Sequence, residues 1–350
     1  MNSWKTWYAR YERLLVTGAL VAGFTFHVVT FRALDVWTML AWLGGYLVLA
    51  AASIAYMQIV DARAVSSVGP LQQRIRAMAP VALQLSFGSL LSMVLLFYWF
   101  SGSLSVSWPV FLFFVLCIGI NEAFPHWYAH VPFQANVFLF VLFCYCSVLV
   151  PYAFHSIEVW TFLMGAGVSL VVAVTYYAVL ARLVPKLRVH TRSVLFSWTL
   201  VSAALSALYF YNLIPPVPVS LREAGIYHNV QRIGGAYQLD SEPESVWQRF
   251  LPGQVIHEDS DGKIYAYTAI YTPKDLNIPI YHEWQRYDTE HGTWVTSDRL
   301  SFSMTGGSQQ GYRGYTFKTH LQPGEWRVNV ETARGQIIGR IPFTYVIKDR

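Results

Sequence analysis

Charged residues are scarce in this sequence: Asp, Glu, Lys and Arg together make up only 13% of the chain. Hydrophobic residues make up 54%, which is too high a share for an ordinary soluble protein. Long apolar runs occupy the chain from Leu14 to about Tyr211, and charge becomes frequent only after Pro215. We therefore predict a polytopic transmembrane domain at residues 1–213 and an exported domain at residues 214–350.

The formal net charge of +5 does not indicate a nucleic-acid-binding surface. After Ile214 the basic and acidic residues are nearly equal in number, so the basic excess lies in the apolar part. A basic excess in loops between apolar spans is what membrane orientation produces. The predicted partner of this part is the lipid bilayer, and no nucleic-acid partner is expected.

Cysteine is also rare, and the three cysteines (Cys117, Cys144 and Cys146) all lie within apolar runs. The region after residue 214 has none, so disulfide bonds do not stabilise it. That region is nevertheless long enough to bury a core of its own.

About seven apolar segments approach the roughly 20 residues that a helix needs to cross a bilayer. We predict spans at residues 14–31, 36–60, 80–100, 108–122, 135–154, 157–181 and 194–213. The first follows a charged segment similar to the start of a signal peptide. Because no convincing cleavage site follows, we interpret it as a retained signal anchor.

Basic residues predict the orientation of these spans, because Lys and Arg accumulate in cytoplasmic loops. Only Arg32 lies in the short loops of one side. The other side carries Lys5, Arg10, Arg13, Arg63, Arg74, Arg76, Arg182, Lys186, Arg188 and Arg192. We predict a cytoplasmic N-terminus and an exported C-terminal domain.

The stretch NEAFPHWYAH, residues 121–130, places Glu122, His126 and His130 four apart. On one continuous helix these side chains would share a face and could ligate zinc or iron. Pro125 interrupts the helix between them, so we favour an interfacial turn and predict no metal. Asn121 and Glu122 remain unusual at the end of a span, and we interpret them as a polar helix-end site that caps the helix or bonds a neighbour.

Motifs of catalysis and cofactor binding are missing: there is no Walker loop, HExxH or kinase signature. Deep positions of the spans hold few ionisable groups, which counts against a transporter or pump. His27 and Gln84 are the main polar residues there, and each is interpreted as a packing residue. We predict no cofactor and no catalytic residue.

The exported region has mostly β signals. After a short helix at residues 241–250, alternating segments predict strands near residues 263–272, 278–287, 293–304, 312–320, 325–332 and 336–347. The last two are expected to form a hairpin, with Pro342 at an edge or bulge. The predicted fold class is a multi-span α-helical membrane bundle followed by a mostly-β, sandwich-like, immunoglobulin-like domain.

Three stretches resemble a known family: IPPVPVSLREAGIYHNV (214–230), YHEWQR (281–286) and PGEWRVNVETARGQIIGRIPFTYV (323–346). They are similar to bacterial inner-membrane proteins that end in domain of unknown function 2914. The resemblance implies a β-rich periplasmic module and a Gram-negative source. It implies no activity and supplies no catalytic residue.

Tyr265, Tyr267 and Tyr271 share one face of a predicted strand, opposite Ile264, Ala266, Thr268 and Ile270. If the tyrosines face outward, they are candidates to bind an envelope glycan or a protein partner; if they face inward, they are core.

Candidate acid and base groups of an enzyme are His228, His257, His282, His291, Glu283 and Asp288, but no nucleophile motif accompanies them. His282 is expected at the surface beside a buried Trp284. We expect a membrane-anchored periplasmic binding or scaffolding module rather than an enzyme. The alternative is a membrane-embedded transporter or enzyme in envelope lipid or glycan traffic, with the β domain as accessory.

Overall fold

The structure is a computed structural model. It describes residues 25, 29, 35–63, 69–101, 104–214, 219–233, 236–242, 253–257, 262–271, 279–303 and 312–347. The span predicted at residues 14–31 and most of the helix predicted at 241–250 lie outside this part of the chain. Inter-residue contacts divide the chain into two compact units: residues 1–97, 110–153 and 158–207 form one, and residues 98–109, 154–157 and 208–350 form the other.

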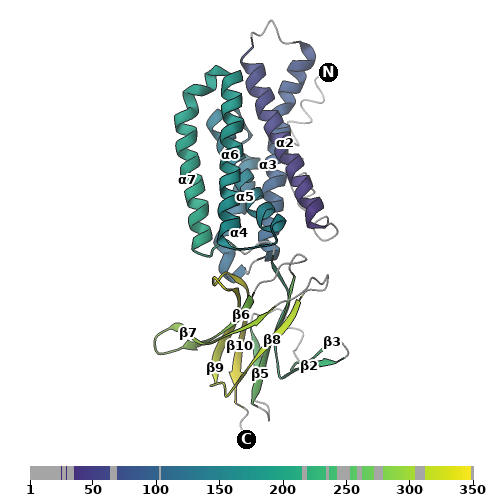
Figure 1. Ribbon diagram of the computed structural model, residues 1–350, viewed down its shortest axis with the longest axis vertical. Coiled ribbons are helices and arrows are strands. Elements are labelled where there is room, and N and C mark those ends of the chain that lie inside the picture. The colour runs from purple at the N-terminus through teal and green to yellow at the C-terminus, as the bar shows by residue number, and fades with distance from the viewer. Residues whose placement is uncertain are drawn as a thin grey trace. The chain divides into compact units, whose positions relative to one another are not determined.

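Helices dominate the first unit, and they run side by side in Figure 1. They are α2 (Val36–Asp61), α3 (Pro70–Ser101), α4 (Leu104–Ala123), α5 (Val131–Ala153), α6 (Val159–Leu183) and α7 (Thr191–Phe210). The short 3-10 helices η2 (Pro125–Ala129) and η3 (Pro185–His190) connect consecutive helices.

Within the described residues, five helical segments are long and apolar enough to cross a membrane, judged by length and composition. A sixth, Ser107–Ala123, is apolar but shorter. The helical, membrane-type character predicted for the first part of the chain is confirmed at this level, and the count of seven stays a prediction.

Helices α5 and α6 approach each other closely at a glycine. A Cβ atom on Gly165 of α6 would lie 2.8 Å from the carbonyl oxygen of Cys146 on α5. Only glycine therefore permits this approach between the two helices.

The second unit is rich in β-strands (Figure 1). They are β1 (Ser220–Tyr227), β2 (Asn229–Ile233), β3 (Ala236–Asp240), β4 (Gln254–His257), β5 (Lys263–Tyr271), β6 (Pro279–Asp288), β7 (Thr293–Ser303), β8 (Tyr312–Thr319), β9 (Gly324–Thr332) and β10 (Ile337–Val346). They form a three-stranded sheet in the order β1-β5-β8, a five-stranded sheet in the order β4-β10-β9-β6-β7, and the hairpin β2-β3.

Both larger sheets contribute side chains to one hydrophobic core. Ile264 and Ile270 enter it from β5, while Trp284 of β6 and Trp326 of β9 enter it from the five-stranded sheet. These four side chains are at most 3% exposed. The burial expected for Trp284 is therefore confirmed, and Ile264 and Ile270 lie on the core face of β5.

The hairpin predicted near the C-terminus is present: β9 and β10 pair antiparallel on either side of a turn at Arg334 and Gly335. Strand β10 lies between β9 and β4 in the sheet, so the edge expected at Pro342 is only a local one. The register explains how proline is tolerated. β4 pairs with β10 only from Phe343 onward, so Pro342 faces no partner on that side.

Candidate functional site

The histidines near the end of α4 do not converge with Glu122. Helix α4 ends at Ala123, and η2 begins at Pro125, as the proline predicted. His126 and His130 are both exposed. No group of three or more metal-ligating side chains occurs among the residues that the structure describes.

Asn121 and Glu122 instead join a polar network with the neighbouring helix α3. The Gln84 amide donates to the Asn121 carbonyl oxygen at 3.1 Å and to the Glu122 carboxylate at 3.4 Å. The Asn121 side chain donates back to the Gln84 carbonyl oxygen at 3.4 Å and accepts a hydrogen bond from the Tyr128 hydroxyl. Asn121 is 3% exposed and Tyr128 is 1% exposed, so Tyr128 packs inside the unit rather than lying in an outer aromatic belt.

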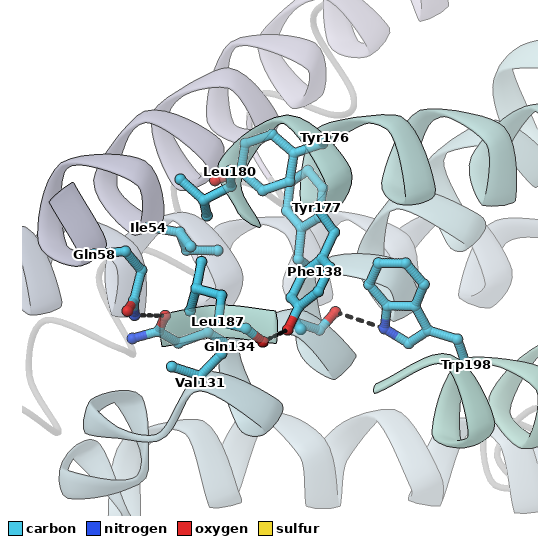
Figure 2. A pocket seen from close by; sticks show the side chains of 11 residues that line it. Ile54, Gln58, Val131, Gln134, Phe138, Tyr176, Tyr177, Leu180, Leu187 and Trp198 are labelled. Atoms are coloured by element: carbon cyan, nitrogen blue, oxygen red, sulfur yellow. Dashed lines mark hydrogen bonds between the residues drawn. The ribbon is translucent and has the colours of Figure 1, made fainter. Parts of the chain in front are cut away.

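The network continues into α5 and α2. Gln134 of α5 donates to the Tyr128 carbonyl oxygen at 2.5 Å, and Gln58 of α2 donates to Gln134 Oε1 at 2.9 Å. Figure 2 shows Gln58 and Gln134 facing each other across this contact. A cavity of about 10 Å³ lies beside them, which is at the lower limit for one water molecule. The network thus links α2, α3, α4 and α5 through side-chain amides and Tyr128, and the space next to it is too small for a substrate.

The two faces of β5 separate as the alternation predicted. Ile264, Ala266, Thr268 and Ile270 are buried in or beside the main core, and the tyrosines lie on the opposite face. Tyr267 is only 1% exposed on that face, because the β2-β3 hairpin covers it with Val230, Tyr237 and Leu239. Burial raises the pKa of Tyr267 to about 12. Tyr267 is therefore not available as an exposed ligand residue in this structure.

The outer two tyrosines have different surroundings. Tyr271 lies at the far end of the strand, and the guanidinium carbon of Arg222 is 5.1 Å from its ring centroid. Tyr265 is half-buried and contacts two rings of β8, with centroid distances of 5.9 Å to Tyr315 and 5.6 Å to Phe317. The three tyrosines named by their spacing thus do not act as one row.

A different set of aromatic rings forms a partly exposed surface on this face. We define this aromatic platform as Tyr237, Tyr265, Tyr315 and Phe317. Tyr237 reaches it from β3, with its ring 6.4 Å from that of Tyr315. Tyr315 and Phe317 are 40% and 50% exposed. These two residues were not predicted from the sequence, although alternation in YRGYTFKT places them together on the outward face of β8.

The acid and base groups of the second unit lie in different environments. His282 is buried rather than at the surface, because it shares a strand face with Trp284, two residues further on. Glu283 lies on the opposite face, as expected. His228 and His257 both contact Glu242, at 3.0 Å and 2.9 Å, and no sequence pattern predicted these contacts.

These features define a class of protein that has helices of membrane-spanning character followed by a β-rich region. Residues 278–345, covering strands β6 to β10, match the family described as "Protein of unknown function (DUF2914)". The resemblance noted in the C-terminal sequence is confirmed by this match. A search of curated proteins finds no relative of the chain.

One solved structure that aligns with the chain is the Pseudomonas fluorescens alkylpurine DNA glycosylase AlkC bound to DNA containing an abasic site analog. The identity is 10%, the alignment covers 86% of this chain and 97% of the other, and the TM-score is 0.23. A likeness at this level supports neither a shared fold nor a shared activity.

Proposed function

We propose that this protein is a membrane-anchored binding or scaffolding module of the cell envelope, with its β-rich domain binding the glycan part of an envelope component. The observation that carries the proposal is the aromatic platform. Four rings from three strands form a continuous, partly exposed surface in a domain whose other described aromatic side chains mostly pack inward. Aromatic rings of this kind stack on the apolar faces of sugar rings.

The size of the platform favours a glycan over a folded protein. Four partly exposed aromatic side chains offer roughly 300 Å² of surface. A stable protein–protein interface buries about 800 Å² on each partner. The platform is therefore too small for the core of such an interface, whereas two or three sugar rings would cover it.

The orientation follows from the basic residues of the loops. It places the N-terminus in the cytoplasm and residues 214–350, as a separate domain, in the periplasm of a Gram-negative inner membrane. Strand order supports an immunoglobulin-like sandwich for this domain. The orders β1-β5-β8 and β10-β9-β6-β7 correspond to strands A-B-E and G-F-C-C′ of that fold.

A second candidate function rests on the buried amide network of the helical unit. A transporter or membrane-embedded enzyme handling envelope lipid or glycan would need polar groups between its helices, and Gln84, Asn121 and Gln134 supply them. Glu122 carries the only carboxylate bonded to this network among the described residues. In that case Glu122→Gln would abolish substrate movement, whereas in the favoured function it would leave glycan binding unchanged.

The proposal is tested with the intact protein in detergent micelles. We expect it to bind glycan strands released from peptidoglycan, measured by calorimetry, and to bind maltohexaose at least tenfold more weakly. Tyr315→Ala and Phe317→Ala should each weaken binding at least fivefold without lowering the melting temperature. Tyr211→Ala is a matched control, because Tyr211 is 79% exposed and lies outside the platform. Equal binding by the platform variants and the control would rule out the platform as the glycan site.

A further inference from the structure

The outward face of the five-stranded sheet carries a row of polar side chains that crosses four strands. The register aligns Arg299, Glu283, Asn329 and Arg340 from β7, β6, β9 and β10. Residues two apart on a strand project to the same side, so Arg327 of β9 shares this face with Asn329. The whole row lies within the family-matched segment.

Arg327 and Arg340 are held by neutral amides. Arg327 Nε donates to Gln285 Oε1 at 2.7 Å, and Arg340 Nε donates to Asn329 Oδ1 at 2.8 Å. A carboxamide fixes the position of a guanidinium group without neutralising its charge. Among the described residues, the Nη groups of both arginines have no hydrogen-bond partner.

Glu283 influences the pKa of both arginines, but its carboxylate oxygens already accept other hydrogen bonds. Glu283 accepts hydrogen bonds from the Thr296 hydroxyl at 2.8 Å and from the Asn329 amide at 3.0 Å. Within the described parts of the chain, neither Arg327 nor Arg340 forms an ion pair. Arg299, on the same face, does form one, with Glu331 at 2.7 Å. Glu325 lies two residues before Arg327 on the same face of β9, but among the described residues no carboxylate is bonded to Arg327 or Arg340.

This arrangement is unfavourable for the domain alone. Burial and the nearby charge of Arg340 lower the pKa of Arg327 to about 10, and burial also lowers the pKa of Arg340. Two half-buried like charges repel each other, and one carboxylate does not compensate both. The ring of Trp294 lies under Arg327, 4.2 Å from its guanidinium carbon, and keeps that group in place.

We propose that Arg327 and Arg340 form a phosphate-binding site on this face. Each guanidinium group is fixed through Nε, which leaves its two Nη groups for a ligand. The two Nη groups of one guanidinium are sufficient to bind the two oxygens of a carboxylate. The Nη groups of two adjacent arginines match the several oxygens of a tetrahedral phosphate. A soluble phosphate ester and a phospholipid headgroup share this chemistry. The site is independent of the aromatic platform, which lies on the other sheet.

The test uses the intact protein in a neutral detergent, with calorimetric titrations at constant ionic strength. The ligands are inorganic phosphate, glycerol 3-phosphate, acetate, and dihexanoyl phosphatidylglycerol below its micelle concentration. We expect phosphate and its esters to bind at least tenfold more tightly than acetate. Tighter binding of the lipid than of glycerol 3-phosphate identifies a headgroup as the source, and equal binding identifies a soluble ester. Acetate binding as tightly as phosphate would overturn the assignment.

Substitutions separate a binding role from a structural one. Arg327→Gln and Arg340→Gln should each weaken phosphate binding at least tenfold. Arg327→Lys should weaken it too, because lysine keeps the positive charge but lacks the paired N–H donors of the guanidinium group. The matched control is Arg313→Gln, an exposed arginine on β8 of the other sheet. The melting temperature of Arg340→Gln should stay equal or rise, since a repelled charge is removed. Retained phosphate affinity in the two glutamine variants, or equal loss in the control, would overturn the proposal.

Discussion

His282 Nδ1 lies 2.9 Å from Thr316 Oγ1, so a buried histidine on β6 of the five-stranded sheet bonds directly to β8 of the other sheet. Its Nε2 atom lies 3.0 Å from Thr268 Oγ1 on β5. Trp284 Nε1 also donates to Thr316 Oγ1, at 3.1 Å. A neutral imidazole with its proton on Nε2 satisfies these contacts: Nε2 donates to Thr268, and the Thr316 hydroxyl donates to Nδ1. Three polar side chains thus join the two sheets inside an apolar core.

The first prediction is that this histidine makes the β-rich unit sensitive to acid. Burial lowers the pKa of His282 from 6.5 to about 3. Between these values the unfolded chain binds a proton that the folded chain does not, so stability falls as the pH drops below about 6.5. Above that pH the effect vanishes. By pH 3 the loss approaches about 4–5 kcal/mol.

The measurement is thermal unfolding of the intact protein between pH 4 and pH 7, followed by β-sheet circular dichroism. His282→Gln should lower the melting temperature at pH 7 but reduce its dependence on pH. His291→Gln is the control, because the His291 side chain is 75% exposed and bonds only Asp288. An unchanged pH dependence in His282→Gln would show that another group controls acid unfolding.

The second prediction concerns the amide pair Gln58 and Gln134. Gln134→Leu should lower the stability of the protein in detergent by about 1–3 kcal/mol, because it leaves Gln58 and the Tyr128 carbonyl group without a partner. The double variant Gln58→Leu, Gln134→Leu should recover part of this loss, since both amides are then removed. Additive losses in the double-mutant cycle would show that the two side chains do not interact.

The third prediction is the orientation. Alkaline phosphatase fused after Arg350 should be active, because the basic loops place the C-terminus outside the cytoplasm. The same enzyme fused after Lys186, in the basic η3 segment between α6 and α7, should be inactive. A fluorescent protein that folds only in the cytoplasm should give the reverse pattern. Activity at Lys186 with none at Arg350 would reject the predicted topology.

Local periodicity predicted much of the fold. Helices α2 to α7 and strands β5 to β10 occur where apolar runs and alternation indicated them. The same rule should have placed His282 inside, because it lies two residues from Trp284; its polarity led to the wrong prediction. The covering hairpin β2-β3 was missed, although Gly-Gly at residues 234–235 is a typical hairpin signal.

Contacts between distant segments could not be predicted in this way. Gln58 and Gln134 are 76 residues apart, and they lie in α2 and α5, whose apolar residues are not confined to one face. Such helices have no amphipathic stripe from which their rotation could be inferred. The Arg327–Arg340 pair depends on the register of β9 and β10, which a hairpin turn fixes only to within a residue or two. A slip of one residue would move Arg340 to the opposite face.

The last prediction separates packing from binding on the outer face of the three-stranded sheet. Tyr267 is 1% exposed and lies 5.5 Å from the ring of Tyr237. Tyr267→Ala should therefore lower the free energy of unfolding by about 3–5 kcal/mol, as expected for a large buried aromatic side chain. Tyr315→Ala, on the neighbouring strand and 40% exposed, should change it by less than about 1 kcal/mol.

Denaturant unfolding of both variants, followed by tryptophan fluorescence, measures this difference. Tyr267→Phe is the matched control, since it keeps the ring and should remain close to the wild type. Glycan binding should depend on Tyr315 rather than on the hydroxyl of Tyr267. Tyr315→Ala should lose glycan binding while it remains folded, and Tyr267→Phe should retain it. A small effect of Tyr267→Ala on stability would mean that the β2-β3 hairpin leaves this face open in solution. All three tyrosines of β5 would then be accessible to a ligand, as their spacing first suggested.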